Sequence, residues 1–166
     1  MKIVLIGFMG SGKTEVGKTL AKKLAKTYRE MDLLLLKKSE EESINDIFEK
    51  SGEIRFRELE IEVAKDLQDE IDTIIATGGG VVMNKIIIDY LRQNNGILIY
   101  LRTSFDHICE RLQGDMTRPL FKDKVKAKEL YSFREPLYKH YADIIIDTEN
   151  KTVDSIVDEL ADTLKL

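Results

Sequence analysis

The residues Gly7–Thr14, with the sequence Gly-Phe-Met-Gly-Ser-Gly-Lys-Thr, constrain the fold of this chain more than any other stretch. They follow a largely apolar run at residues 2–6 and precede a helix-like pattern at residues 15–26. Strand, glycine loop and helix is the order in which G-x-x-x-x-G-K-[ST] binds phosphate, because the backbone N–H groups and the helix N-terminus converge on an anion. The alternative is a glycine turn that joins a strand to a helix without a ligand.

A phosphate-binding loop would make this chain a nucleotide-binding protein. The backbone of Gly10, Ser11 and Gly12 would surround the phosphates of ATP, and Lys13 would reach the β- and γ-phosphates. The hydroxyl of Thr14 would coordinate Mg²⁺. We therefore predict ATP and Mg²⁺ as ligands.

Composition and charge exclude several other classes of protein. The chain has 166 residues, of which 43% are hydrophobic, and its net charge is −4. An acidic chain is a poor nucleic-acid binder, because phosphate neutralisation needs an excess of Lys and Arg. We see no apolar run long enough to span a membrane, no leader pattern, and a single cysteine, Cys109. These features predict a cytoplasmic protein that binds neither nucleic acid nor membrane.

Apolar strands alternate with helical patterns along the whole chain, which predicts an α/β sandwich around a parallel sheet in one domain, residues 1–166. We expect five strands, at residues 2–6, 27–32, 73–77, 96–101 and 142–147. We expect helices between them, at residues 15–26, 43–50, 53–69, 81–93, 104–112, 125–141 and 152–166. Gly52 should end the helix at 43–50, and Pro136 should kink or divide the helix at 125–141.

Three features near the expected strand ends are candidates for a binding site. Asp32 would contact magnesium-bound water or a substrate hydroxyl, or it is a solvated turn carboxylate. Arg57 would clamp a substrate carboxylate, or it lies on the surface. The segment Gly78-Gly79-Gly80 would let a ligand or a second segment approach the backbone closely, or it is a flexible turn.

The polar segment at residues 113–124 lacks helical periodicity, and a loop of this length is either functional or disordered. Arg118 precedes Pro119 there, which suggests a lid that brings a cation over the phosphates. His107, His140 and Cys109 have no metal-like spacing, and we interpret all three as structural residues.

Taken together, these motifs resemble those of the shikimate kinase family. The chain carries the phosphate loop, an acidic pair, Gly52-Glu53-x-x-Phe56-Arg57-x-x-Glu60, Thr77-Gly78-Gly79-Gly80, Arg118-Pro119-Leu120 and Arg134-x-x-Leu137-Tyr138, all in family order. The resemblance covers essentially the whole chain, and the later motifs make it specific.

The resemblance implies a nucleoside-monophosphate-kinase-like three-layer sandwich with strand order 2-3-1-4-5. The implied reaction transfers the γ-phosphoryl group of ATP to the 3-hydroxyl of shikimate, a step in chorismate and aromatic amino-acid synthesis. The substrate-binding helices would lie at about residues 33–61 and the lid at about residues 113–124. The family is mainly monomeric, which implies a monomer by analogy.

The resemblance also implies roles for individual residues. The substrate-binding positions would be Asp32, Arg57, Gly78, Gly79, Gly80 and Arg134, with the two arginines on the ring carboxylate. Lys13, Asp32 and Arg118 would be the catalytic residues. Arg111 would pack on adenine, and Lys151 would border the base.

Two residues depart from the family pattern. The family usually has Asp-x-Asp after its second strand, whereas this chain has Glu30-Met31-Asp32, so the contact of Glu30 with magnesium-bound water is an open question. Glu15 stands where the family commonly has Ser or Thr. Its backbone N–H can still serve the α-phosphate, but its carboxylate must point away from the nucleotide.

Two other functions remain as alternatives. A gluconate kinase also phosphorylates a polyhydroxylated carboxylate, so the arginines do not separate it from a shikimate kinase. A non-catalytic ATP-binding module would keep the phosphate loop without turnover, and the lid arginine and Asp32 argue against it.

Overall fold

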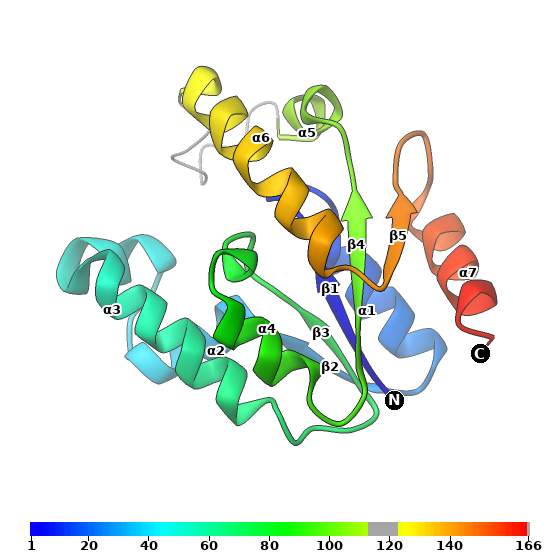
Figure 1. Cartoon of the computed structure of the whole chain (residues 1–166), viewed down its shortest axis with the longest axis horizontal. Coiled ribbons are helices and arrows are strands. Elements are labelled where there is room, and N and C mark those ends of the chain that lie inside the picture. The colour runs from blue at the N-terminus through cyan, green and yellow to red at the C-terminus, as the bar shows by residue number, and fades with distance from the viewer. Residues whose placement is uncertain (113–122, 166) are drawn as a thin grey trace.

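A parallel sheet of five strands, in the order β2-β3-β1-β4-β5, forms the centre of the molecule (Figure 1). The structure is a computed structural model, and it describes residues 1–112 and 123–165. The strands are β1 (Lys2–Ile6), β2 (Thr27–Glu30), β3 (Thr73–Ala76), β4 (Gly96–Arg102) and β5 (Ile144–Asp147). The predicted fold class and strand order are confirmed.

Helices cover both faces of this sheet. They are α1 (Lys13–Lys23), α2 (Met31–Ser39), α3 (Ile44–Asp66), the 3-10 helix η1 (Val81–Met83), α4 (Lys85–Arg92), α5 (Phe105–Arg111), α6 (Lys124–Tyr141) and α7 (Val153–Thr163). Helices α1 and α7 lie on one face, and α2, α3, α4 and α6 lie on the other (Figure 1). Within the described part of the chain, no helix combines the length and the apolar character that crossing a membrane requires.

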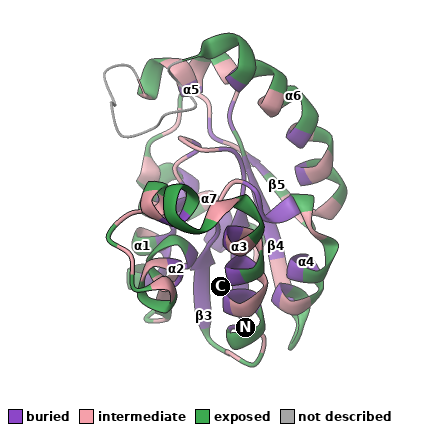
Figure 2. Ribbon diagram, turned by 90° about the vertical axis from the view of Figure 1, so that its left-hand side faces the viewer, coloured by how far each residue is buried: buried purple, intermediate pink, exposed green. Residues whose placement is uncertain are grey.

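Alternate residues of the central strand supply two separate cores. Ile3 and Leu5 pack with α1 and α7, whereas Val4 and Ile6 pack with the helices of the opposite face. This alternation follows from the period of two residues in a strand, and burial on both faces explains the unbroken apolar run. Figure 2 shows the buried residues along the strands and the exposed residues on the outer sides of the helices.

The predicted break at Gly52 is present inside α3. Gly52 has φ 78° and ψ 170°, which is not a helical conformation. Helix α3 therefore consists of two helical segments that meet at a kink at Gly52. The Ser43 side chain accepts a hydrogen bond from the Asp46 N–H and caps the start of α3. The bend turns the first part of α3 away from the axis of the part that carries Arg57.

Two predicted elements were wrong in their boundaries. The second strand ends at Glu30, and Asp32 lies in the first turn of α2 instead of in a strand or a loop. The helix predicted at residues 81–93 is two helices, η1 and α4, because Asn84 adopts an extended conformation and its side chain accepts a hydrogen bond from the Ile86 N–H.

The proline in α6 does not divide that helix. Helix α6 continues through Pro136 from Lys124 to Tyr141. Proline removes one N–H donor from a helix, but the packing of Arg134 and Tyr138 on the buried side of α6 holds the segment together across this position.

Candidate active site

The loop between β1 and α1 has the geometry of a phosphate-binding loop. Gly10 and Gly12 have φ values of 76° and 89°, in the left-handed region that side chains disfavour, and Gly12 is the residue before the first turn of α1. The Ser11 hydroxyl is buried and makes no hydrogen bond within the described residues. The N-terminus of α1 therefore opens onto a turn of backbone that can receive an anion.

Lys13 lies inside this loop. Its side chain is 8% exposed, and Nζ donates hydrogen bonds to the carbonyl oxygens of Gly7 and Phe8, each at 2.8 Å. These bonds keep a buried cation paired in the protein without nucleotide. The oxygens of a phosphate group at the N-terminus of α1 can replace these carbonyl oxygens as hydrogen-bond acceptors for the same ammonium group.

Thr14 and Glu30 form the part of the site that suits a divalent metal. Thr14 Oγ1 donates a hydrogen bond to Glu30 Oε1 at 2.9 Å. Because Thr14 Oγ1 is the hydrogen-bond donor here, its lone pairs stay available to a cation. Hydroxyl and carboxylate oxygens are ligands that Mg²⁺ prefers. The described residues contain no group of three or more His, Cys, Asp and Glu side chains suited to a metal. A metal ion here would therefore need phosphate and water oxygens to complete its coordination.

The segment Gly78–Gly80 after β3 contacts three parts of the site. A methyl group on Gly78 would lie 3.2 Å from Asp32 Oδ1 and 3.5 Å from Glu60 Oε1. One on Gly79 would lie 3.4 Å from the Met9 backbone nitrogen, and one on Gly80 would lie 2.6 Å from Arg57 Nη1. A side chain on Gly80 would displace Arg57, and one on Gly78 would crowd Asp32, whereas one on Gly79 would make an ordinary contact. The close approach that the sequence predicted is therefore tightest at Gly80.

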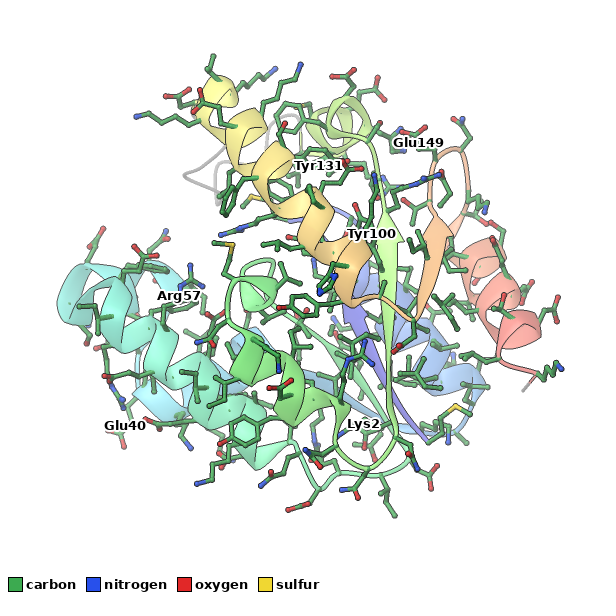
Figure 3. All side chains as sticks on the ribbon, viewed as in Figure 1. Lys2, Glu40, Arg57, Tyr100, Tyr131 and Glu149 are labelled. Atoms are coloured by element: carbon green, nitrogen blue, oxygen red, sulfur yellow. The ribbon has the colours of Figure 1, made fainter. Side chains whose placement is uncertain are left out.

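Arg57 lies next to this segment on α3. Nη1 donates a hydrogen bond to Glu60 Oε2 at 2.6 Å, and the guanidinium carbon lies 5.2 Å from the centroid of the Phe56 ring. The Arg57 side chain is 28% exposed, whereas Glu60 is 2% exposed. The guanidinium is thus held on one side by a buried carboxylate while part of it faces solvent. Figure 3 shows Arg57 on α3. It also shows Lys2 at the start of β1, at the opposite end of the sheet from Tyr131.

A second buried cation, Arg134, faces the same cluster from α6. Burial lowers the pKa of the Arg134 guanidinium from its ordinary value, and the positive charge of Arg57 lowers it further. The Nε atom of Arg134 is buried and makes no hydrogen bond within the described residues. Two neighbouring guanidinium groups, one of which has this buried donor without a partner among the described residues, are suited to bind a carboxylate.

Most of the residues predicted for the site gather here. The structure brings the phosphate loop, Asp32, Arg57, Arg134 and the Gly78–Gly80 segment to the ends of β1, β2 and β3. Glu15 lies in the first turn of α1, and its side chain is exposed. Arg118 and most of the predicted lid lie outside the described residues.

Arg111 lies beside the phosphate loop, and Lys151 lies in the loop after β5 that Arg111 also contacts. Arg111 Nη1 donates a hydrogen bond to the Gly10 carbonyl at 3.5 Å, and Nη2 donates to the Thr148 carbonyl at 3.3 Å. The backbone N–H of Lys151 donates to the same Thr148 oxygen at 3.4 Å, and Nζ donates to Glu159 Oε2 at 2.5 Å. The loop after β5 therefore borders the phosphate loop.

The sequence predicted no role for two residues of the cluster. Glu60 lies three residues after Arg57, and Tyr138 lies four residues after Arg134, which are the spacings that bring side chains together on a helix. The Tyr138 hydroxyl donates a hydrogen bond to the Gly79 carbonyl at 2.5 Å. Helical spacing from each predicted arginine was the signal that could have identified both residues.

The buried carboxyl of Glu60 predicts a pH-dependent cost in stability. Burial raises the pKa of Glu60 above its ordinary value of 4.5, although the Arg57 charge opposes this shift. A raised pKa in the folded state means that ionised Glu60 destabilises the fold; the cost is absent below the unfolded pKa and grows as the pH rises toward the folded pKa.

We therefore expect Glu60→Gln to raise the melting temperature relative to the unmodified protein, and by more at about pH 8 than at about pH 5. Thermal unfolding followed by circular dichroism at both pH values measures this difference. The matched control is Glu58→Gln, an exposed carboxylate on the same helix, which should change the melting temperature little at either pH. A Glu60→Gln protein that is equally destabilised at both pH values would contradict the expectation.

Comparisons with known proteins agree on one family. The sequence model of the shikimate kinase family matches residues 9–165. The shikimate kinase of Chromobacterium violaceum is 39% identical over 163 residues, which cover 96% of this chain and 88% of the relative. The solved structure of shikimate kinase from Acinetobacter baumannii in complex with shikimate has a TM-score of 0.91 at 31% identity and covers 99% of this chain and 92% of its own. A gluconokinase from Sinorhizobium meliloti covers 99% of this chain and 95% of its own, with a TM-score of 0.62 at 16% identity, and is similar in fold alone.

Proposed function

Because the chain belongs to the shikimate kinase family, we propose that it transfers the γ-phosphoryl group of ATP to the 3-hydroxyl of shikimate. The products would be shikimate 3-phosphate and ADP, in the pathway to chorismate and the aromatic amino acids. The protein is an enzyme, a phosphotransferase whose acceptor is an alcohol.

One observation carries this proposal. The Gly78–Gly80 segment contacts the phosphate loop through Gly79, and it contacts Asp32 and Arg57 through its two outer glycines. A nucleotide on the loop and an anionic alcohol held by Arg57 would therefore meet across this segment. Phosphoryl transfer depends mainly on such positioning and on charge stabilisation.

The substrate half of the site would orient the acceptor. Arg57 and Arg134 would bind the carboxylate of shikimate, and Glu60 would hold Arg57 in place. The Gly78–Gly80 backbone would lie against the ring. Asp32 would then hydrogen-bond the attacking hydroxyl and accept its proton as the bond to phosphorus forms.

The nucleotide half would neutralise the charge on the transferred group. Lys13 would exchange its carbonyl partners, Gly7 and Phe8, for phosphate oxygens. Arg118 would add a second cation from the lid. The backbone around Gly10–Gly12 would hold the remaining phosphates, and Arg111 and Lys151 would border the base.

The metal would be held by Thr14, with Glu30 and Asp32 contacting it through water. Bound Mg²⁺ would supply neutralisation of the phosphate charge. Glu30 already accepts the Thr14 hydroxyl hydrogen, which leaves the threonine oxygen available as a ligand.

A coupled assay of ADP release tests this function. We expect shikimate to stimulate ADP release strongly, and gluconate to leave the rate at the level seen without an acceptor. Stimulation by gluconate instead would favour the gluconate kinase alternative. ATP binding without turnover on either acceptor would favour a non-catalytic module. The cytoplasmic location and the monomeric state stay predictions.

A further inference from the structure

A hydroxyl group outside the predicted site is connected to the metal-binding threonine through one carboxylate. The Tyr28 hydroxyl donates a hydrogen bond to Glu30 Oε2 at 3.2 Å, and Thr14 Oγ1 donates to Glu30 Oε1 at 2.9 Å. Each oxygen of Glu30 therefore holds one hydroxyl. Tyr28 and Glu30 are two residues apart in β2, so their side chains leave the strand on the same side.

The ring of Tyr28 is held by the same helix that carries Thr14. A methyl group on Gly17 would lie 2.8 Å from Cε2 of Tyr28 and 3.5 Å from Cδ2. Gly17 lies three residues after Thr14 in α1 and is buried. Glycine in the middle of a helix costs stability relative to alanine. The room that it leaves for the tyrosine ring is a physical reason for its presence here.

Because the Glu30 side chain is long, a second hydrogen-bond partner helps to hold its carboxylate in place. Glutamate has one more methylene group, and one more rotatable bond, than the aspartate usual in the family at this position. A carboxylate on a longer side chain loses more conformational freedom when it is held in one place.

We propose that Tyr28 is a positioning residue for the metal–nucleotide complex. By holding Glu30, Tyr28 keeps the Thr14 hydroxyl hydrogen on the carboxylate and the Thr14 oxygen lone pairs available to a divalent cation that arrives with the nucleotide. The inference rests on the proposed function as an ATP-dependent kinase, and it concerns the metal-dependent part of nucleotide binding.

The test is the effect of Mg²⁺ on ADP affinity in Tyr28→Phe. Isothermal titration calorimetry gives the dissociation constant of ADP with Mg²⁺ and with EDTA. We expect the gain in affinity that Mg²⁺ provides to fall about five-fold in the variant, because the lost hydrogen bond acts on the metal only through Glu30 and therefore counts as one of ordinary strength. Affinity for ADP in EDTA should not change, because the phosphate loop is intact. Tyr90→Phe, on α4 and partly buried, is the matched control and should behave like the unmodified protein.

A double-mutant cycle with Glu30→Ala tests the connection itself. If Tyr28 acts through Glu30, Tyr28→Phe should have no further effect on the Mg²⁺ gain once Glu30 is alanine. An unchanged Mg²⁺ gain in Tyr28→Phe would overturn the inference. Equal losses of ADP affinity with and without Mg²⁺ would also overturn it, since they indicate a purely structural role. The measurement uses ADP alone, so a failure to phosphorylate shikimate would count only against the proposed function.

Discussion

Replacing Lys13 with methionine should lower kcat about 10²- to 10³-fold, the loss typical when one preorganised donor to a developing negative charge is removed. Lys13 is buried in the phosphate loop, and its ammonium group donates hydrogen bonds to the Gly7 and Phe8 carbonyls, which a phosphate group can replace. Methionine keeps an unbranched side chain in the loop and removes the charge. Steady-state kinetics at saturating ATP and shikimate measure the effect.

The control for this change lies on the same helix. Lys18 is an exposed residue of α1, and Lys18→Met should leave kcat unchanged. Circular dichroism would verify that the Lys13→Met protein is folded. A folded Lys13→Met protein with nearly normal turnover would show that the ammonium group does not act on the transferred phosphoryl group.

Replacing Arg57 with alanine should raise the KM for shikimate about 100-fold, because a hydrogen-bonded charge partner of the substrate carboxylate is lost. The KM for ATP should change much less, since the phosphate loop does not depend on this arginine. The variant also leaves Glu60 buried without its 2.6 Å partner, so a lower melting temperature is expected too. Initial rates over a range of shikimate concentrations measure the KM.

Arg55→Ala is the matched control. Arg55 lies two residues earlier in α3 and forms ion pairs with Glu58 and Glu62 at the surface. Its removal should not affect the KM for shikimate. If the KM for shikimate stayed the same in Arg57→Ala, the assignment of Arg57 to the carboxylate would be wrong.

The strands and the phosphate loop could be predicted because their signals are local. The residues of β1 form a short buried run, and the glycines beside Lys13 have φ values that few other residues adopt. Gly52 was correctly predicted to interrupt a helical pattern. In each case the physical cause lies within a few residues of the effect.

Other features could not be predicted in this way. The boundary at Asn84 depends on a local side-chain cap inside a pattern that also fits one helix. Pro136 lies inside a helix that contacts β4, where Tyr138 stacks on Tyr100. The Tyr28–Glu30–Thr14 connection exists because β2 lies beside α1 in the folded chain. Residue spacing alone contains no information about such a pairing.

The candidate site itself was predicted as separate motifs. Asp32, Arg57 and Arg134 lie far apart in the sequence, and the resemblance to a family was needed to join them. In the structure the parallel sheet brings them together, since the segments after its strands meet at one edge. The lid arginine, Arg118, lies outside the residues that the structure describes.

We expect the two arginines and Asp32 to orient shikimate so that one particular hydroxyl meets the γ-phosphate. Phosphorus–proton correlation NMR of the product reports which ring position carries the phosphate. We predict a single product with phosphorus coupled to the proton at position 3. Phosphate at another ring position, a mixture of positions, or release of inorganic phosphate without a phosphorylated product would contradict the account.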